Sequence, residues 1–109
     1  MNKYFRKIVV DNIEYDWLYK KTYYDSYIYI YKIYYEINKY DTLTRKRRFV
    51  TKYDIQPFCE KDINAHDINI TPSIASRFIK YKVGSGGYLI TKKYLRQLKL
   101  KKIKEIYEE

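Results

Sequence analysis

SYIYIYKIYYEI, residues 26–37, is rich in Ile and Tyr and alternates between two sets of side chains. If this segment is a strand, Tyr27, Tyr29 and Tyr31 share one face, because successive side chains of a strand point to opposite faces. Its β-branched and aromatic residues favour a strand. A helical spacing of some tyrosines is the weaker alternative, because strong helix formers are scarce. We predict a long central strand, with helices covering one side of the sheet and these tyrosines in the core or half-covered. The alternative is that they are exposed and supply stacking surfaces for a single-stranded nucleic acid.

Strand patterns also flank this segment. Upstream, two runs rich in β-branched and aromatic residues are separated by Asp11-Asn12, which tolerate the positive φ of a tight hairpin. The second run alternates apolar with mostly acidic positions, so its apolar face is predicted to be core with Trp17 as anchor. An exposed, stacking Trp17 is the alternative. A turn at 38–41 leads into a last strand, and the four predicted strands are 5–10, 13–19, 26–37 and 42–53.

The second half of the chain is predicted to be helical. Thr71 is a suitable N-cap before Pro72, and Gly84 follows the last apolar positions of this helix. Thr91 can cap a second helix. A short helical turn is expected around 60–65, within an otherwise irregular connection. The predicted segments are the sheet (1–53), the connection (54–70), the first helix (71–83), a glycine-rich joint (84–90) and the last helix (91–108).

These elements predict an α+β domain: a four-stranded antiparallel meander sheet followed by two C-terminal helices packed on one face. With 109 residues the chain is long enough for one hydrophobic core and too short for two independent ones. Tyr accounts for 16 residues, so part of that core must be built from tyrosine. A multidomain enzyme is therefore excluded.

Cysteine content and hydropathy indicate the cellular compartment. The single cysteine, Cys59, excludes an intramolecular disulfide and fits a reducing environment. Residues 1–10 lack the apolar stretch of a signal peptide, and no run approaches the roughly 18 apolar residues of a membrane span. We expect a soluble cytoplasmic protein that does not associate with membranes.

The net charge is +10, from 23 Lys and Arg against 13 Asp and Glu, which favours anionic partners. Codon usage offers another explanation. Lys, Tyr, Ile and Asn make up 53 residues, and all four have codons of A and T alone, so an AT-rich genome would raise both the charge and the Tyr content. The placement of the charge is more informative: residues 72–109 carry a net charge of +7, and residues 1–71 carry +3.

Two groups of basic residues are predicted to bind nucleic-acid phosphates, and folding is expected to gather them into one patch. The first group lies on the predicted fourth strand, where the alternation of side chains places two of its residues on each face of the sheet. Its alternative role is to prevent edge-to-edge pairing with another sheet. The second begins the last helix, where a docked anion would relieve the unfavourable macrodipole. That helix either lays its lysine stems along an apolar surface or projects from the domain. The predicted residues are Arg45, Lys46, Arg47, Arg48, Lys92, Lys93 and Arg96.

Catalytic and metal-binding signatures are weak, so we expect a protein without enzymatic activity, cofactor or metal. Cys59 and His66 both lie in the irregular connection, but their spacing matches no catalytic or zinc motif. The glycines within 84–87 lack the Gly-Lys-Ser/Thr junction of a phosphate loop.

The sequence favours a small basic binding module that contacts nucleic-acid phosphates electrostatically, with weak sequence selectivity. Few Arg, Asn or Gln are clustered for base readout. The alternative is a protein-interaction or inhibitor-type accessory module with a Tyr-rich surface for an acidic protein. Homo-oligomerisation through a sheet edge or the last helix is a third alternative, and a membrane-surface role for that helix is the weakest.

Overall fold

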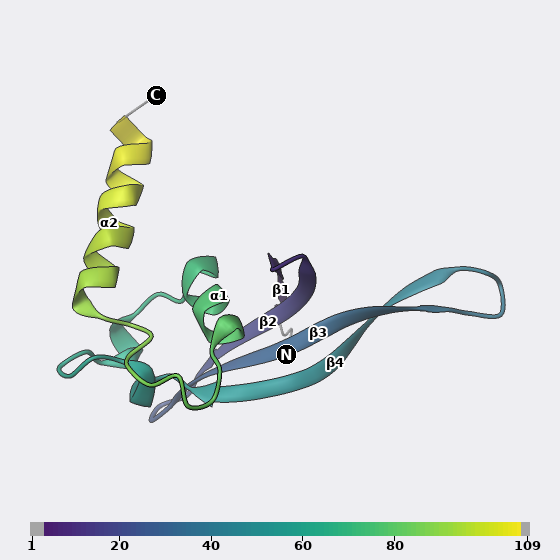
Figure 1. Ribbon diagram of the computed structural model, residues 1–109, viewed down its shortest axis with the longest axis horizontal. Coiled ribbons are helices and arrows are strands. Elements are labelled where there is room, and N and C mark those ends of the chain that lie inside the picture. The colour runs from purple at the N-terminus through teal and green to yellow at the C-terminus, as the bar shows by residue number, and fades with distance from the viewer. Residues whose placement is uncertain (1–3, 108–109) are drawn as a thin grey trace.

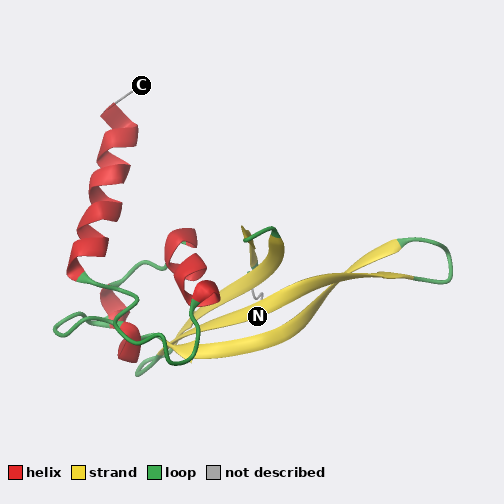
Figure 2. Ribbon diagram, in the orientation of Figure 1, coloured by secondary structure: helices red, strands yellow, loops and turns green. Residues whose placement is uncertain are grey.

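The computed structural model describes the backbone of residues 4–107 and the side chains of residues 4–100. Its sheet is antiparallel with the strand order β1-β2-β3-β4, as predicted (Figure 1). Two helices follow the sheet in the chain, so the predicted α+β class is confirmed (Figure 2). The strands are β1 (Arg6–Val10), β2 (Ile13–Lys21), β3 (Ser26–Ile37) and β4 (Leu43–Asp54).

Short-range preferences set two of the turns between strands. Asp11 and Asn12 adopt φ values of 52° and 65°, the left-handed conformation that a two-residue hairpin turn needs. Between β3 and β4, Asn38 organises the turn, because its Oδ1 accepts hydrogen bonds from the backbone N–H groups of Tyr40 and Thr42 at 2.9 and 3.1 Å. Both turns therefore follow from the residues that form them.

β3 and β4 extend beyond the rest of the sheet as a two-stranded ribbon (Figure 1). β2 pairs with β3 only between Ser26 and Lys32, whereas β4 pairs with β3 as far as Ile37. We call residues 33–47 the distal ribbon. Most of its side chains are exposed, because each strand of the ribbon has a sheet neighbour on one side only, whereas Ile33 at its start is buried.

A β-bulge interrupts the pairing of β4 at Val50. Ile30 pairs with Thr51, but the next residue, Tyr31, pairs with Phe49, so Val50 has no residue opposite it. One extra residue reverses the alternation on its own strand. Lys52 consequently shares a face with Phe49, although strict alternation would place the two on opposite faces.

The hydrophobic core lies on the side of the sheet that faces α1 (Pro72–Lys80). Trp17 is 1% exposed, which confirms it as a core anchor, and it belongs to one cluster with Ile28 and Ile30 of β3. Phe78 of α1 is buried in the same cluster. Removal of these large side chains from water is the main stabilising contribution to the fold.

The irregular connection packs onto this core and is fixed by Gln56. The side-chain amide of Gln56 donates to the carbonyl of Ile63 at 2.8 Å and accepts from the backbone N–H of Ala65 at 2.9 Å. The helical turn expected at 60–65 is wrong, because Asp62 has a φ of 72°, which a right-handed helix does not allow. Short 3₁₀ turns lie on either side of that segment, at Gln56–Phe58 and Ala65–Asp67.

The first helix starts as predicted and ends early. The Oγ1 of Thr71 accepts a hydrogen bond from the backbone N–H of Ile74 at 3.3 Å, which caps α1. The helix stops at Lys80, before the predicted end at residue 83, because Tyr81 is already extended. Its ring packs edge-to-face against Phe58 at 5.0 Å, so tertiary packing ends the helix ahead of the glycines.

The second helix, α2 (Lys92–Tyr107), joins the core through its first turns and then projects from the domain (Figure 1). Tyr94 is buried and Leu95 packs against the core, whereas Leu100 is 65% exposed. Of the two placements that the sequence left open, the structure shows the projecting one. Residue 108 of the predicted helix lies outside the described residues. No helix in the described part of the chain is long and apolar enough to span a membrane.

Candidate nucleic-acid interface

β4 divides the basic run at 45–48 between the two faces of the sheet, as alternation predicted. Lys46 and Arg48 lie on the core side, whereas Arg45 and Arg47 lie on the opposite side, which we call the open face. Within residues 4–107 no helix packs on the open face, because the core cluster joins α1, the connection and the start of α2 to the other side.

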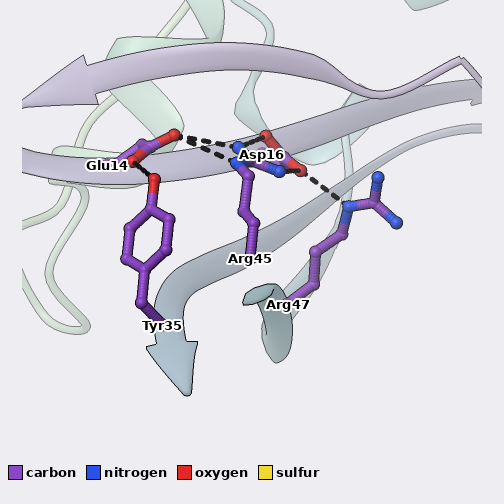
Figure 3. Close-up of polar contacts among 5 residues, drawn as sticks. All are labelled: Glu14, Asp16, Tyr35, Arg45 and Arg47. Carbon is purple, nitrogen blue, oxygen red and sulfur yellow. Dashed lines mark hydrogen bonds and ion pairs between the residues drawn. The ribbon is translucent and has the colours of Figure 1, made fainter. Parts of the chain in front are cut away.

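Arg45 is anchored on the open face by two carboxylates of β2 (Figure 3). Its Nη1 and Nη2 donate to Oδ2 and Oδ1 of Asp16 at 2.7 and 2.5 Å, a bidentate pair, and its Nη2 donates to Oε1 of Glu14 at 3.0 Å. The Nε of Arg47 donates to Oδ2 of Asp16 at 2.6 Å, and the Tyr35 hydroxyl donates to Oε2 of Glu14 at 2.8 Å. Asp16 is 1% exposed, so two guanidinium groups compensate a buried charge.

This network lowers the pKa of both carboxyls. Burial disfavours the charged form of Asp16, but hydrogen bonds from Arg45 and Arg47 outweigh it, so the pKa of Asp16 lies below its ordinary value. Hydrogen bonds from Tyr35 and Arg45 lower the pKa of Glu14. Both carboxylates therefore stay ionised under mildly acidic conditions.

We expect the protein to lose stability on acidification below about pH 4, where unfolded Asp and Glu become protonated. A carboxylate with a lowered folded pKa contributes stability that is present above its unfolded pKa and is lost as pH falls through the folded pKa. Urea unfolding at a series of pH values measures this loss. Asp16→Asn lacks one of the two titrating groups, so its stability should vary less with pH; the same pH dependence in both proteins would contradict the assignment.

The sequence placed Arg45 and Arg47 among the phosphate ligands, but the structure engages both with Asp16, a residue that sequence reasoning did not select. The acidic face of β2 was the signal that could have identified it. Only the pairing of β2 and β4 with β3 brings that face to the two arginines, which are 29 and 31 residues away in the chain.

Exposed cations lie on the core side of the distal ribbon and where the ribbon joins the rest of the sheet. Lys32 of β3 pairs directly opposite Arg48, so two like charges face each other across strands, which costs stability. The guanidinium carbon of Arg48 lies 5.1 Å from the ring centre of Tyr34, and these three residues line a shallow depression. Lys46 lies 4.0 Å from Glu36, an exposed and therefore weak pair.

The bulge turns Lys52 to the open face, where its Nζ lies 4.2 Å from the ring centre of Tyr27 and 5.5 Å from that of Tyr29. No described carboxylate lies within ion-pair distance of Lys52, Lys32 or Arg48. Three of these cations lie on β4, which is an edge strand. We call the group the cationic edge; it consists of Lys32, Lys46, Arg48 and Lys52.

The second predicted group lies at the end of the molecule away from the tip of the distal ribbon (Figure 1). The backbone N–H of Lys92 donates to Oε2 of Glu60 at 2.7 Å, and its Nζ lies 3.9 Å from Asp62. A carboxylate of the connection thus takes the position at which an external anion was expected. Lys93 and Arg96 are exposed beside it. The structure does not bring the two predicted groups into one patch.

We found no protein family, curated protein or solved structure that matches this chain. Its function must therefore be inferred from the side chains themselves.

The residues that sequence analysis considered for catalysis have separate partners. Cys59 is buried, its thiol donates to the carbonyl of Ile55 at 3.5 Å, and burial raises its pKa. The Nε2 of His66 lies 3.1 Å from the carbonyl oxygen of Thr22, and its Nδ1 lies 3.5 Å from the hydroxyl of Ser26. In the described residues no three His, Cys, Asp or Glu side chains are grouped to hold a metal ion.

Proposed function

We propose that this protein is a non-enzymatic nucleic-acid-binding module that contacts phosphates through its cationic edge. The observation that carries this proposal is the opposed pair of Lys32 and Arg48, which has no described carboxylate within ion-pair distance. A phosphate between the two would turn a repulsive pair into two favourable contacts. Arg48 offers a planar fork of donors and Lys32 a compact charge.

Lys46 and Lys52 extend this charge along the same edge strand. Cations at intervals along one strand can follow a phosphate backbone, and such contacts position a nucleic acid without reading its bases. Binding is therefore expected to depend strongly on salt and to show little sequence selectivity.

Fluorescence anisotropy of a labelled single-stranded oligonucleotide over a salt series tests this proposal. In the wild-type protein the logarithm of the affinity is expected to fall linearly with the logarithm of the salt concentration. Replacing Lys32, Arg48 and Lys52 together with Gln should reduce the slope by about 2 if each side chain contacts one phosphate of a single strand.

A matched control removes the same charge from the other end of the molecule. Lys92→Gln, Lys93→Gln and Arg96→Gln together should leave most of the slope, because α2 lies at the end of the molecule away from the distal ribbon (Figure 1). If this control variant loses the salt slope and the variant of Lys32, Arg48 and Lys52 keeps it, the phosphates bind at α2 instead of at the cationic edge. A wild-type affinity that does not change with salt would dismiss nucleic-acid binding altogether.

The tip of the distal ribbon favours a second candidate, contact with an acidic protein. Ile37 and Leu43 pair across the ribbon and are 70% and 64% exposed, and the exposed ring of Tyr35 lies on the same face. Exposed apolar and aromatic side chains bordered by cations suit a protein partner. Copurification before and after nuclease treatment separates the two candidates. A protein that stays bound after nuclease treatment, and that does not bind an Ile37→Ser, Leu43→Ser variant, supports the second candidate.

A further inference from the structure

We infer that the open face of the sheet stacks the bases of a single-stranded nucleic acid, an inference that rests on the proposed function. Tyr27, Tyr29 and Tyr31 lie along β3 on this face, and Phe49 of β4 is opposite Tyr31 in the register. α1 and the core occupy the other side of the sheet, so no described helix covers these rings.

The spacing of the tyrosines suits successive bases. Alternate residues of a strand recur at roughly 6.8 Å, so the three rings form a regular row along β3. Every base has a flat π face that stacks on an aromatic ring, whatever the sequence. Tyr27, Tyr29 and Tyr31 are half-buried and Phe49 is 55% exposed, so the row lies at the surface and is anchored there by packing.

Neighbouring side chains hold one end of this row in place. Tyr31 packs edge-to-face against Phe5 and Phe49, with ring centres 5.2 and 5.6 Å away. The guanidinium carbon of Arg47, which is held by Asp16, lies 3.9 Å from the ring centre of Phe5. Rings fixed in advance lose less conformational entropy on binding than mobile ones. The ion pair of Asp16 and Arg47 on the open face therefore helps to hold this row of aromatic rings in place.

Lys52 marks the accessible π faces of Tyr27 and Tyr29, because its ammonium lies over both rings. A base stacked there would displace the ammonium, which can then contact the phosphate attached to that base. Lys20 of β2 is opposite Tyr27 in the register and supplies a cation on the other side of the row. Asp54 is opposite Tyr27 on β4, and the charge of Asp25 also acts on the Tyr27 hydroxyl, so two carboxylates here repel a phosphate.

Stacking on this row selects a single strand, because a duplex encloses its base faces. A duplex offers its phosphates and base edges to a protein, so it can contact the cationic edge but cannot use the tyrosines. A single strand that passes around the edge strand β4 can use both surfaces, with its bases on the open face beside Lys52 and its phosphates reaching Lys46 and Arg48 on the core side. The expected preference is therefore for a single strand over a duplex of the same sequence.

Competition with unlabelled nucleic acid tests this preference in the wild-type protein. A single strand should displace the labelled oligonucleotide at a concentration about tenfold or more below that of the matching duplex, since stacking of even one base is worth that factor. Tyr27→Leu and Tyr29→Leu should each weaken single-strand affinity about tenfold. The salt slope should stay unchanged in these variants, because no charge is removed.

Two further variants separate stacking from loss of structure. Tyr27→Phe with Tyr29→Phe keeps both rings, so single-strand affinity should remain within about threefold of wild type, because each ring can still stack on a base. Tyr23→Leu with Tyr24→Leu removes two highly exposed rings from the β2–β3 turn and should leave the affinity unchanged. Tyrosine-to-phenylalanine variants that bind as weakly as the leucine variants would overturn stacking as the cause.

Single-strand affinity, duplex affinity and salt dependence together distinguish base stacking from phosphate binding. Equal affinity for single strand and duplex, with the salt slope intact, would overturn the inference and leave phosphate binding by the cationic edge standing. Affinity without salt dependence would overturn both. Polyglutamate that competes as well as an oligonucleotide of equal charge would overturn base stacking and assign the open face to an acidic protein.

Discussion

Phe78→Ala is expected to lower the free energy of unfolding by about 3–5 kcal/mol, because it opens a cavity in the core. Phe78 is 1% exposed. Its ring centre lies 5.3 Å from that of Phe58 in an edge-to-face contact and 5.6 Å from that of Tyr53. One side chain thus joins α1, the irregular connection and β4. A domain of this size has only about 5–15 kcal/mol of stability, so the variant should be close to unfolding.

Urea denaturation followed by circular dichroism measures this loss. Phe78→Leu fills more of the cavity and should lose less stability than Phe78→Ala. Val83 is 94% exposed, so Val83→Ala should change the free energy of unfolding by no more than about 0.5 kcal/mol. A loss below about 1 kcal/mol in Phe78→Ala would mean that α1 does not anchor the core as the structure places it.

Elements with local signals could be predicted from the sequence. Asp11-Asn12 tolerates the positive φ that its turn requires, and the Thr71 hydroxyl caps the helix that it precedes. The alternation of residues 26–37 identified the central strand, and burial of Trp17 followed from the same pattern on β2. In each case the pattern that allowed the prediction lies within a short stretch of the chain.

The β-bulge had no such signal. Strict alternation along β4 would place Lys52 with Lys46 and Arg48 on the core side. The unpaired Val50 reverses that order and sends Lys52 to the tyrosine row. A bulge depends on how two strands fit against each other, so the sequence of β4 alone could not reveal that one edge strand presents cations to both faces of the sheet.

Long-range pairing also decided the roles of the basic residues. Alternation separated Arg45 and Arg47 from their neighbours, but it could not show that Asp16 lies within reach of both. The start of α2 presented the same difficulty, since Glu60 reaches its N-terminus from 32 residues away. The charge of a side chain is visible in the sequence, whereas its neutralisation depends on the fold.

Asp16→Ala is expected to lower the free energy of unfolding by about 3 kcal/mol, because it leaves two hydrogen-bonded guanidinium groups without their shared acceptor. Arg45 and Arg47 retain side-chain exposures of 24% and 45%, so water can solvate them in part and the loss lies at the low end for a buried ion pair. Urea denaturation at neutral pH measures it. Glu36→Gln breaks only an exposed pair with Lys46 and should cost less than about 0.5 kcal/mol.

Asp16→Leu combined with Arg45→Met and Arg47→Met tests where that cost arises. Replacing a whole buried ionic group with apolar side chains is often neutral or stabilising, so this triple variant should recover most of the stability that Asp16→Ala loses. If the triple variant does not recover this stability, the interactions among Asp16, Arg45 and Arg47 stabilise the fold by more than the cost of burying their charges. The triple variant should also keep the wild-type salt slope in nucleic-acid binding, because Arg45 and Arg47 are engaged with Asp16 and the phosphates are assigned to the cationic edge.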